Sequence, residues 1–164
     1  MRIFLKYLLL LLLLAFVVIQ FFRPAKNQSV GIAASDISRL YPVPASVQSI
    51  LATSCNDCHS NNTTYPWYAK VQPMAWWLDD HIREGKKELN FSEFASYSLR
   101  KQYHKLEEIA EQVQDDEMPL PSYLIAHRSA KLTPDQKITL AAWVETTRNA
   151  MRARYPIDSL VRKK

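Results

Sequence analysis

The stretch Cys55-Asn56-Asp57-Cys58-His59 places two thiols three positions apart, with an imidazole directly after the second thiol. This C-x-x-C-H pattern is typical of covalent c-type haem attachment. With this spacing near a helix end, each thiol reaches one vinyl group of a single porphyrin, and the next residue lies beneath the iron. The pattern therefore predicts haem c, one per chain, bound covalently through Cys55 and Cys58. We expect His59 to be the first axial ligand of the iron.

Three other interpretations of the two cysteines are weaker. A thioredoxin-like C-x-x-C needs a βαβ context, and the sequence offers no convincing strand. A zinc site needs four ligands, but these are the only cysteines, and His81, His104 and His127 are scattered singly. A disulfide across two intervening residues would constrain very little chain. Covalent haem remains the favoured interpretation.

The N-terminus carries an apolar segment long enough to cross a bilayer. Residues 3–22 are apolar apart from Lys6 and Gln20, and about 20 apolar residues span a membrane as a helix. The sequence Arg23-Pro24-Ala25-Lys26 follows, which is not a clean small-x-small cleavage site. These features favour an uncleaved signal anchor over residues 1–26, with a cleaved signal peptide as the alternative.

The charge distribution bears on location and partners. Four of the 21 basic residues and none of the 16 acidic ones lie in residues 1–26, which leaves 17 basic against 16 acidic residues in the remainder. The basic balance is therefore no argument for nucleic acid, and we expect none as a partner. Flanking charges do not fix the orientation of the segment. Because covalent haem attachment takes place outside the bacterial cytoplasmic membrane, we expect a single-pass protein of that membrane with its domain in the periplasm. The alternative is secretion to the periplasm after cleavage.

The remaining chain is expected to form an all-α domain. Only 2 glycines occur against 9 prolines, which favours helices joined by proline-bounded loops. Residues 27–44 are interpreted as a linker, 45–155 as the domain and 156–164 as a basic tail. Apolar spacing predicts helices over 45–54, 74–86, 92–114 and 133–155. The last begins with the capping box Thr133-Pro134-Asp135-Gln136.

Aromatic residues follow the attachment motif closely. Tyr65, Trp67 and Tyr68 are expected to wall the porphyrin, although ordinary core packing would explain them as well. On the next predicted helix, Trp77 and His81 share an apolar face. A core histidine is the usual explanation of such a position. In a haem protein, however, His81 is also a candidate for the sixth iron ligand.

Met118 is the favoured sixth ligand. It lies between Glu117 and Pro119, in a loop that also contains Pro121. Pro119 drives Met118 out of helical geometry. A proline-fixed loop can hold a soft, neutral thioether against the face of the haem opposite His59. The competing interpretation is a buried methionine that fills a gap in the core.

The order of these parts resembles a class I cytochrome c, with Cys55-Cys58-His59, then Met118-Pro119, then Trp143 on the last helix. More closely, residues 41–148 look like the bacterial haem-binding domain family. The matching stretches are Cys55 to Ser60, Tyr65 to Tyr68, Pro73, Trp77, His81 to Lys86, Leu89 to Ser92 and Glu117 to Tyr123. The aromatic insert from Tyr65 to Phe94 departs from simple class I cytochromes. The resemblance implies a haem site and leaves the physiological reaction open.

Two classes of function follow from this sequence. A monohaem with His59 and Met118 as ligands has both axial positions filled, so we expect an electron carrier and no enzyme, with an unidentified redox protein as its partner. The alternative is a peroxidase-like haem enzyme or a gas or redox sensor, in which the sixth position is open and His81 is a distal acid–base residue.

Overall fold

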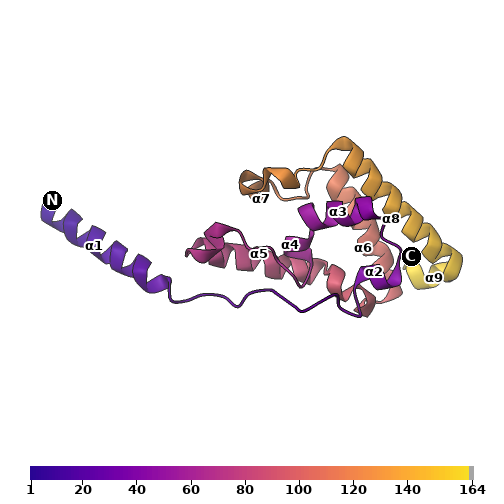
Figure 1. Ribbon diagram of the computed structural model, residues 1–164, viewed down its shortest axis with the longest axis horizontal. Coiled ribbons are helices and arrows are strands. Elements are labelled where there is room, and N and C mark those ends of the chain that lie inside the picture. Colours follow the sequence, from indigo (N-terminus) through magenta and orange to yellow (C-terminus); the bar gives the residue numbers. More distant parts are fainter. Residues whose placement is uncertain (163–164) are drawn as a thin grey trace.

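The computed structural model describes residues 1–162, and these form helices joined by loops, with no strand among them (Figure 1). The all-α fold expected from the sequence is confirmed. The elements are α1 (Arg2–Ile19), α2 (Ile37–Leu40), α3 (Ala45–Ser54), α4 (Asn56–His59), η1 (Trp67–Lys70), α5 (Met74–Glu88), η2 (Phe91–Ser96), α6 (Leu99–Gln114), α7 (Pro121–Ala126), η3 (Arg128–Ala130), α8 (Pro134–Arg154) and α9 (Ile157–Leu160).

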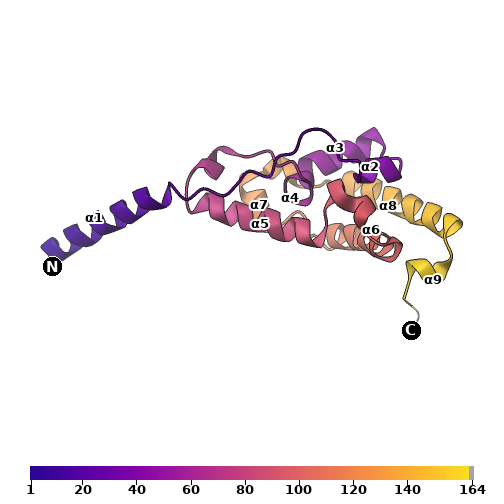
Figure 2. The same ribbon diagram turned by 90° about the horizontal axis from the view of Figure 1, so that it is seen from below.

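The apolar helix α1 lies outside the helical domain. It projects from one end of the domain, and two perpendicular views show that the other helices do not pack against it (Figures 1 and 2). None of its residues is buried, and it is apolar enough to cross a membrane. A helix of this composition has no stable place in water, which is compatible with a membrane anchor or a signal sequence.

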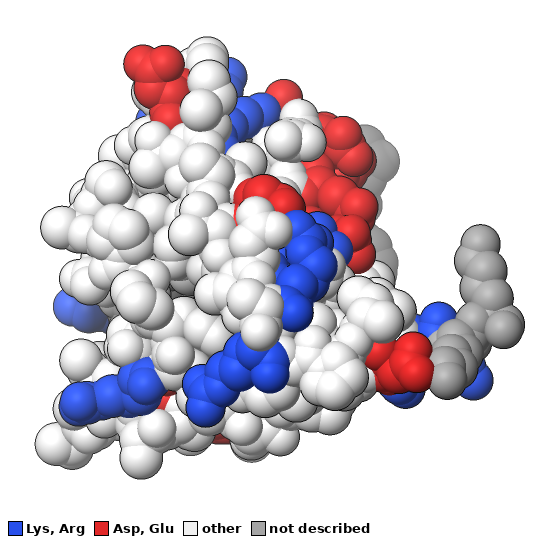
Figure 3. Space-filling view, turned by 90° about the vertical axis from the view of Figure 1, so that its right-hand side faces the viewer, with Lys and Arg blue, Asp and Glu red and all other residues white. Residues whose placement is uncertain are grey.

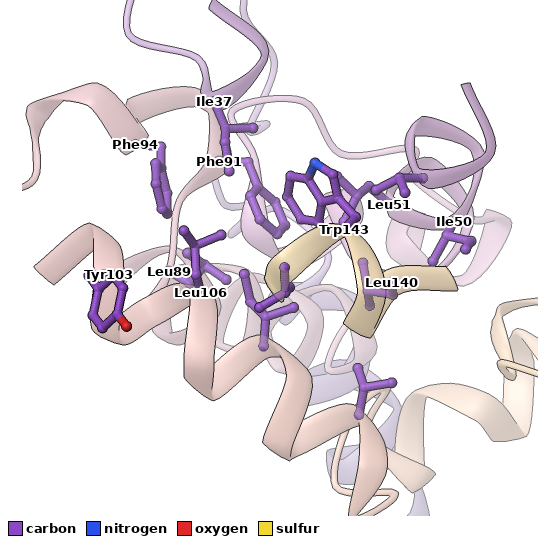
Figure 4. Close-up of a cluster of buried hydrophobic side chains, with 14 of the residues drawn as sticks. Ile37, Ile50, Leu51, Leu89, Phe91, Phe94, Tyr103, Leu106, Leu140 and Trp143 are labelled. Atoms are coloured by element: carbon purple, nitrogen blue, oxygen red, sulfur yellow. The ribbon is translucent and has the colours of Figure 1, made fainter. Parts of the chain in front are cut away.

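One hydrophobic core holds the domain together (Figure 4). The long helices α6 and α8 pack on each other, and α3 packs on α8. Leu106 of α6 and Leu140 of α8 are fully buried, with Trp143 5% exposed beside them. The indole N–H of Trp143 donates to the carbonyl of Pro42 at 3.0 Å, so this aromatic side chain also fixes the chain that leads into α3.

The last long helix agrees with its sequence signals. Thr133 caps α8, and both reciprocal bonds of the capping box with Gln136 are present. One face of α8 is buried, and its residues are Leu140, Trp143, Val144, Thr147 and Met151. Arg148 lies off this face and is nevertheless largely covered. Its side chain is only 14% exposed, and it binds Glu107 of α6 at 2.7 Å.

The attachment motif lies where two helices meet. Cys55 ends α3 and also begins α4, with φ −128° and ψ −43°, so the chain changes direction at this residue. The N–H groups of Cys58 and His59 both donate to the carbonyl of Cys55. The motif is thereby coiled into one short turn, which places the side chains of Cys58 and His59 beside α5.

Three segments differ in detail from the sequence expectation. The helix predicted over 92–114 is two elements, η2 and α6, because Ser98 interrupts the chain and caps α6 through its hydroxyl. Residues 27–44 do not behave as a free linker, since Ile37 of α2 is 3% exposed and belongs to the core. The basic tail predicted from residue 156 contains α9, whose Leu160 is 1% exposed against the same core.

Candidate functional site

Two adjoining cavities meet at the attachment motif. Their volumes are about 310 Å³ and 420 Å³. The first lies against α5 and α7, and the second against α6. Five side chains line both cavities and form their shared wall, namely Cys55, His59, Glu88, Val113 and Met118. The shared wall therefore brings together His59, Cys55 and Met118. The sequence predicts these residues as the first iron ligand, one haem-attachment thiol and the sixth ligand.

The His59 ring is oriented by the backbone of α5 and of the residue that follows it. Its Nδ1 atom lies 3.0 Å from the carbonyl oxygen of Gly85 and 3.0 Å from that of Leu89. A carbonyl only accepts hydrogen bonds, so Nδ1 carries the proton and donates it, which leaves Nε2 with its lone pair. Burial lowers the pKa of His59, and this keeps the imidazole neutral. A neutral imidazole with one N–H held by a carbonyl is the usual state of a metal-binding histidine.

Gly85 allows α5 to approach the motif closely. A Cβ atom added to Gly85 would lie 2.8 Å from the carbonyl oxygen of Cys58 and 3.0 Å from its Cβ. The first contact is too short unless the backbone moves, and the second requires a shift of a few tenths of an ångström. Because the Gly85 carbonyl is also one of the two acceptors for His59, the same close approach positions the imidazole.

The two cysteines are free thiols in this structure. Burial raises the pKa of Cys55 to about 12, and burial together with the charge of Asp57 raises that of Cys58 to about 11. Reactive redox cysteines have the opposite shift, because their thiolate is stabilised. The environment therefore argues against a thioredoxin-like function. Among residues 1–162, no group of three or more His, Cys, Asp or Glu side chains is arranged to hold a metal ion.

Met118 lies in the loop between α6 and α7, against both cavities. The end of α6 holds this loop, because the N–H groups of Glu117 and Met118 both donate to the carbonyl of Gln112. Asp116 takes a positive φ of 59°, which reverses the chain after the helix. Met118 is half-buried and also packs against the hydrophobic core. The position of Met118 is therefore compatible with an iron ligand and with a core methionine.

His81 lines the first cavity only. Its Nδ1 atom donates to the carbonyl of Trp77 at 2.8 Å, one turn earlier in α5. Its ring packs against the Trp77 indole, with 4.3 Å between the ring centroids. In the neutral form of the His81 ring, this bond leaves the lone pair on Nε2. The structure gives Trp77 a role in supporting His81, and Trp77 itself is not among the residues that line either cavity.

The aromatic residues after the motif lie outside the lining of the two cavities. Trp67, which the sequence predicts to wall the porphyrin, is 78% exposed and lines neither cavity. The hydroxyl of Tyr65 instead accepts the N–H of Asn27 at 2.7 Å and holds the N-terminal segment. Tyr68 also lies outside the lining, where its ring contacts that of His127.

The first cavity is closed by residues that sequence reasoning did not single out as a group. Pro119, Leu120, Tyr123 and Leu132 line it beside Met118, so Pro119 lies at the site as expected. The hydroxyl of Tyr123 donates to Oδ2 of Asp57 at 2.7 Å, across 66 positions of sequence. This bond joins α7 to the attachment motif and raises the pKa of Tyr123 further above its usual range, beyond the effect of burial.

Comparison with known proteins agrees with this geometry. The family model of the haem-binding domain matches residues 14–146, a range that includes every residue lining the two cavities. The chain belongs to the haem-binding domain family. Comparisons with curated proteins and with solved structures gave no match.

The residues of this haem-binding domain fit a haem at the shared wall of the cavities. His59 offers an oriented neutral nitrogen, Met118 and His81 offer further donors, and Val113 and Leu120 supply apolar lining. One missed residue had a visible signal. Gly85 is one of only 2 glycines and lies inside a predicted helix, where glycine destabilises unless close packing requires it.

Proposed function

We propose that this haem-binding domain is a monohaem c-type cytochrome-like electron carrier, with the haem attached through Cys55 and Cys58. The observation that carries the proposal is the His59 imidazole, neutral and held by two backbone carbonyls at the wall shared by two cavities. The bound haem supplies one-electron redox chemistry at its iron.

The chain's own residues support a carrier over an enzyme. The backbone acceptors of His59 fix the tautomer and raise the basicity of Nε2. Met118 reaches both cavities from a loop held by α6, so it is available as the second axial ligand. A thioether ligand raises the reduction potential relative to a second histidine. If His59 and Met118 both bound the iron, no ligand position would be left for a substrate.

His81 carries the alternative function. Its ring is held by Trp77 with Nε2 free, and it lines the first cavity. If Met118 packs in the core instead of binding iron, His81 is placed as a distal acid–base residue for a peroxidase-like enzyme or a sensor. A third arrangement has His59 and His81 as two axial histidines.

Covalent attachment is tested directly by extraction. Protein produced in a host with c-type maturation should keep its haem through acid-acetone treatment, because thioether bonds survive acid. The Cys55→Ser, Cys58→Ser double variant should release its haem into the organic phase. Release from the wild-type protein would exclude covalent attachment while leaving haem binding intact.

The axial ligands are tested by paired substitutions. The oxidised protein should be low-spin, with a weak near-infrared sulfur-to-iron charge-transfer band. Met118→Ala should abolish that band, lower the potential and allow carbon monoxide to bind. His81→Ala should leave the band in place. The reverse pattern would establish two histidine ligands, and a high-spin wild-type protein that binds carbon monoxide readily would favour the enzyme or sensor.

The location of the domain follows from α1. Its 18 residues extend about 27 Å at 1.5 Å per residue, close to the roughly 30 Å of a bilayer core. We propose that α1 stays attached as a signal anchor in the cytoplasmic membrane and that the haem domain lies in the periplasm. The full-length chain should then stay in the membrane fraction after a carbonate wash. A soluble product that begins between Ala25 and Ser35 would show that the segment is cleaved.

A further inference from the structure

The end of the domain nearest α1 exposes an unusual set of apolar side chains. Trp67 is 78% exposed, and Phe21 and Phe22 are 83% and 63% exposed. Val71, Met74 and Trp76 are exposed beside them in sequence. Figures 1 and 2 both place the start of α5 and the preceding loop closest to the end of α1. We name this set the proximal surface, and it consists of Phe21, Phe22, Trp67, Val71, Met74 and Trp76.

The proximal surface is bonded to the chain that leaves α1. Gln72, only 1% exposed, forms several hydrogen bonds with this chain. Its N–H donates to Oε1 of Gln20 at 2.9 Å, and its Nε2 donates to the carbonyl of Phe22 at 2.8 Å. The Trp76 indole N–H donates to the same carbonyl at 2.8 Å. The start of α5 is therefore held at the level where α1 ends.

This level corresponds to the bilayer surface if α1 spans the membrane. The interfacial zone is roughly 5–8 Å thick on each side of the hydrocarbon core. Trp76 is bonded to Phe22, two positions beyond the helix cap Gln20. Trp67 begins the short helix η1, which ends at Lys70, and the chain is extended at Val71. At about 2 Å per residue within η1 and about 3.3 Å per residue beyond it, Trp67 lies within roughly 13 Å of Gln72. The long indole side chain of Trp67 and the other members of the surface therefore lie close to the interface.

The chemistry of this end suits lipid headgroups. Tryptophan is enriched at membrane interfaces, where its ring is apolar and its N–H finds a polar partner. Arg23, Lys26 and Lys70 lie in the same segments and are basic, as expected beside anionic lipids. The opposite end differs, because acidic and basic side chains are interspersed there (Figure 3).

We propose that the proximal surface rests in the headgroup region of the bilayer and docks the haem domain onto the membrane in a fixed orientation. The proposal rests on the proposed anchoring by α1. Exposed apolar patches mark surfaces that contact a membrane or another protein, and continuity with the apolar span of α1 favours the membrane here. The cavities then stand at a set height, because His81 and Glu88 follow Met74 along α5 by about 10 Å and about 21 Å.

Photo-crosslinking of the full-length, haem-loaded chain in vesicles of phosphatidylethanolamine and phosphatidylglycerol tests this proposal. The photoreactive residue p-benzoylphenylalanine replaces Trp67 in one variant and Met74 in another, so one misfolded variant does not decide the result. Ile138 of α8, 67% exposed but outside the proximal surface, is the matched control. Leu11 in the middle of α1 reports on the anchor. Haem content verifies the folding of each variant.

Illumination should produce lipid adducts at positions 11, 67 and 74, detected by mass spectrometry, and only background at position 138. Adducts at 11 without adducts at 67 and 74 would overturn the docking surface and leave the anchor intact. Equal adducts at 67, 74 and 138 would show non-specific contact and would also overturn it. The absence of adducts at position 11 would refute the anchor and, with it, this proposal.

Discussion

Gly85→Ala tests the close approach that orients His59. The added methyl group would lie 2.8 Å from the Cys58 carbonyl oxygen, an atom of a rigid backbone turn. Overpacking of this kind destabilises by about 1–3 kcal/mol. Alanine regains about 1 kcal/mol of helix propensity over glycine. A backbone atom cannot rotate out of the way as a side chain can, so we take about 3 kcal/mol for the cost of the clash. After the gain in helix propensity, the free energy of unfolding should fall by about 2 kcal/mol.

The melting temperature of the haem-loaded protein measures this loss. A domain of this size loses roughly 3–5 °C per kcal/mol, so Gly85→Ala should melt about 6–10 °C lower. It should also bind less haem per chain, since the displaced Gly85 carbonyl no longer holds His59. Gly31→Ala is the control, because Gly31 has a positive φ of 72° but no atom within 4 Å of the added carbon. It should lose stability without losing haem. A Gly85→Ala protein as stable as wild type would refute the close contact between α5 and Cys58.

Two further predictions concern contacts that the structure adds. Tyr123→Phe removes the hydrogen bond to Asp57 and should lower the free energy of unfolding, measured by denaturant titration, by about 1 kcal/mol. Unchanged stability would mean that this bond does not join α7 to the motif. Leu160 is 1% exposed, so Leu160→Ala should lower the free energy of unfolding by about 2–5 kcal/mol in the same titration. A change within about 0.5 kcal/mol is typical of surface positions and would show that α9 is not part of the core.

Much of the local structure was predictable. The helix predicted over 74–86 is α5, and the capping box at Thr133 begins α8, because caps and apolar periodicity act over a few residues. The break at Ser98 was missed, since the 3₁₀ segment Phe91–Ser96, itself interrupted at Glu93, lies directly before α6 and extends its helical pattern in the sequence. The exposure of Trp67 was missed because an aromatic residue is equally compatible with core, cofactor and surface until its neighbours are known.

The sequence by itself determined the chemistry of the site. Two thiols and an imidazole at this spacing predict haem attachment, and the apolar run near the N-terminus predicts a membrane anchor or a signal sequence. The tertiary structure decided how that chemistry is held. The acceptors of His59 lie 26 and 30 positions away, and Tyr123 bonds to Asp57 across 66 positions. Such partners depend on how α5 and α7 pack, and packing is a property of the whole core that no local pattern encodes.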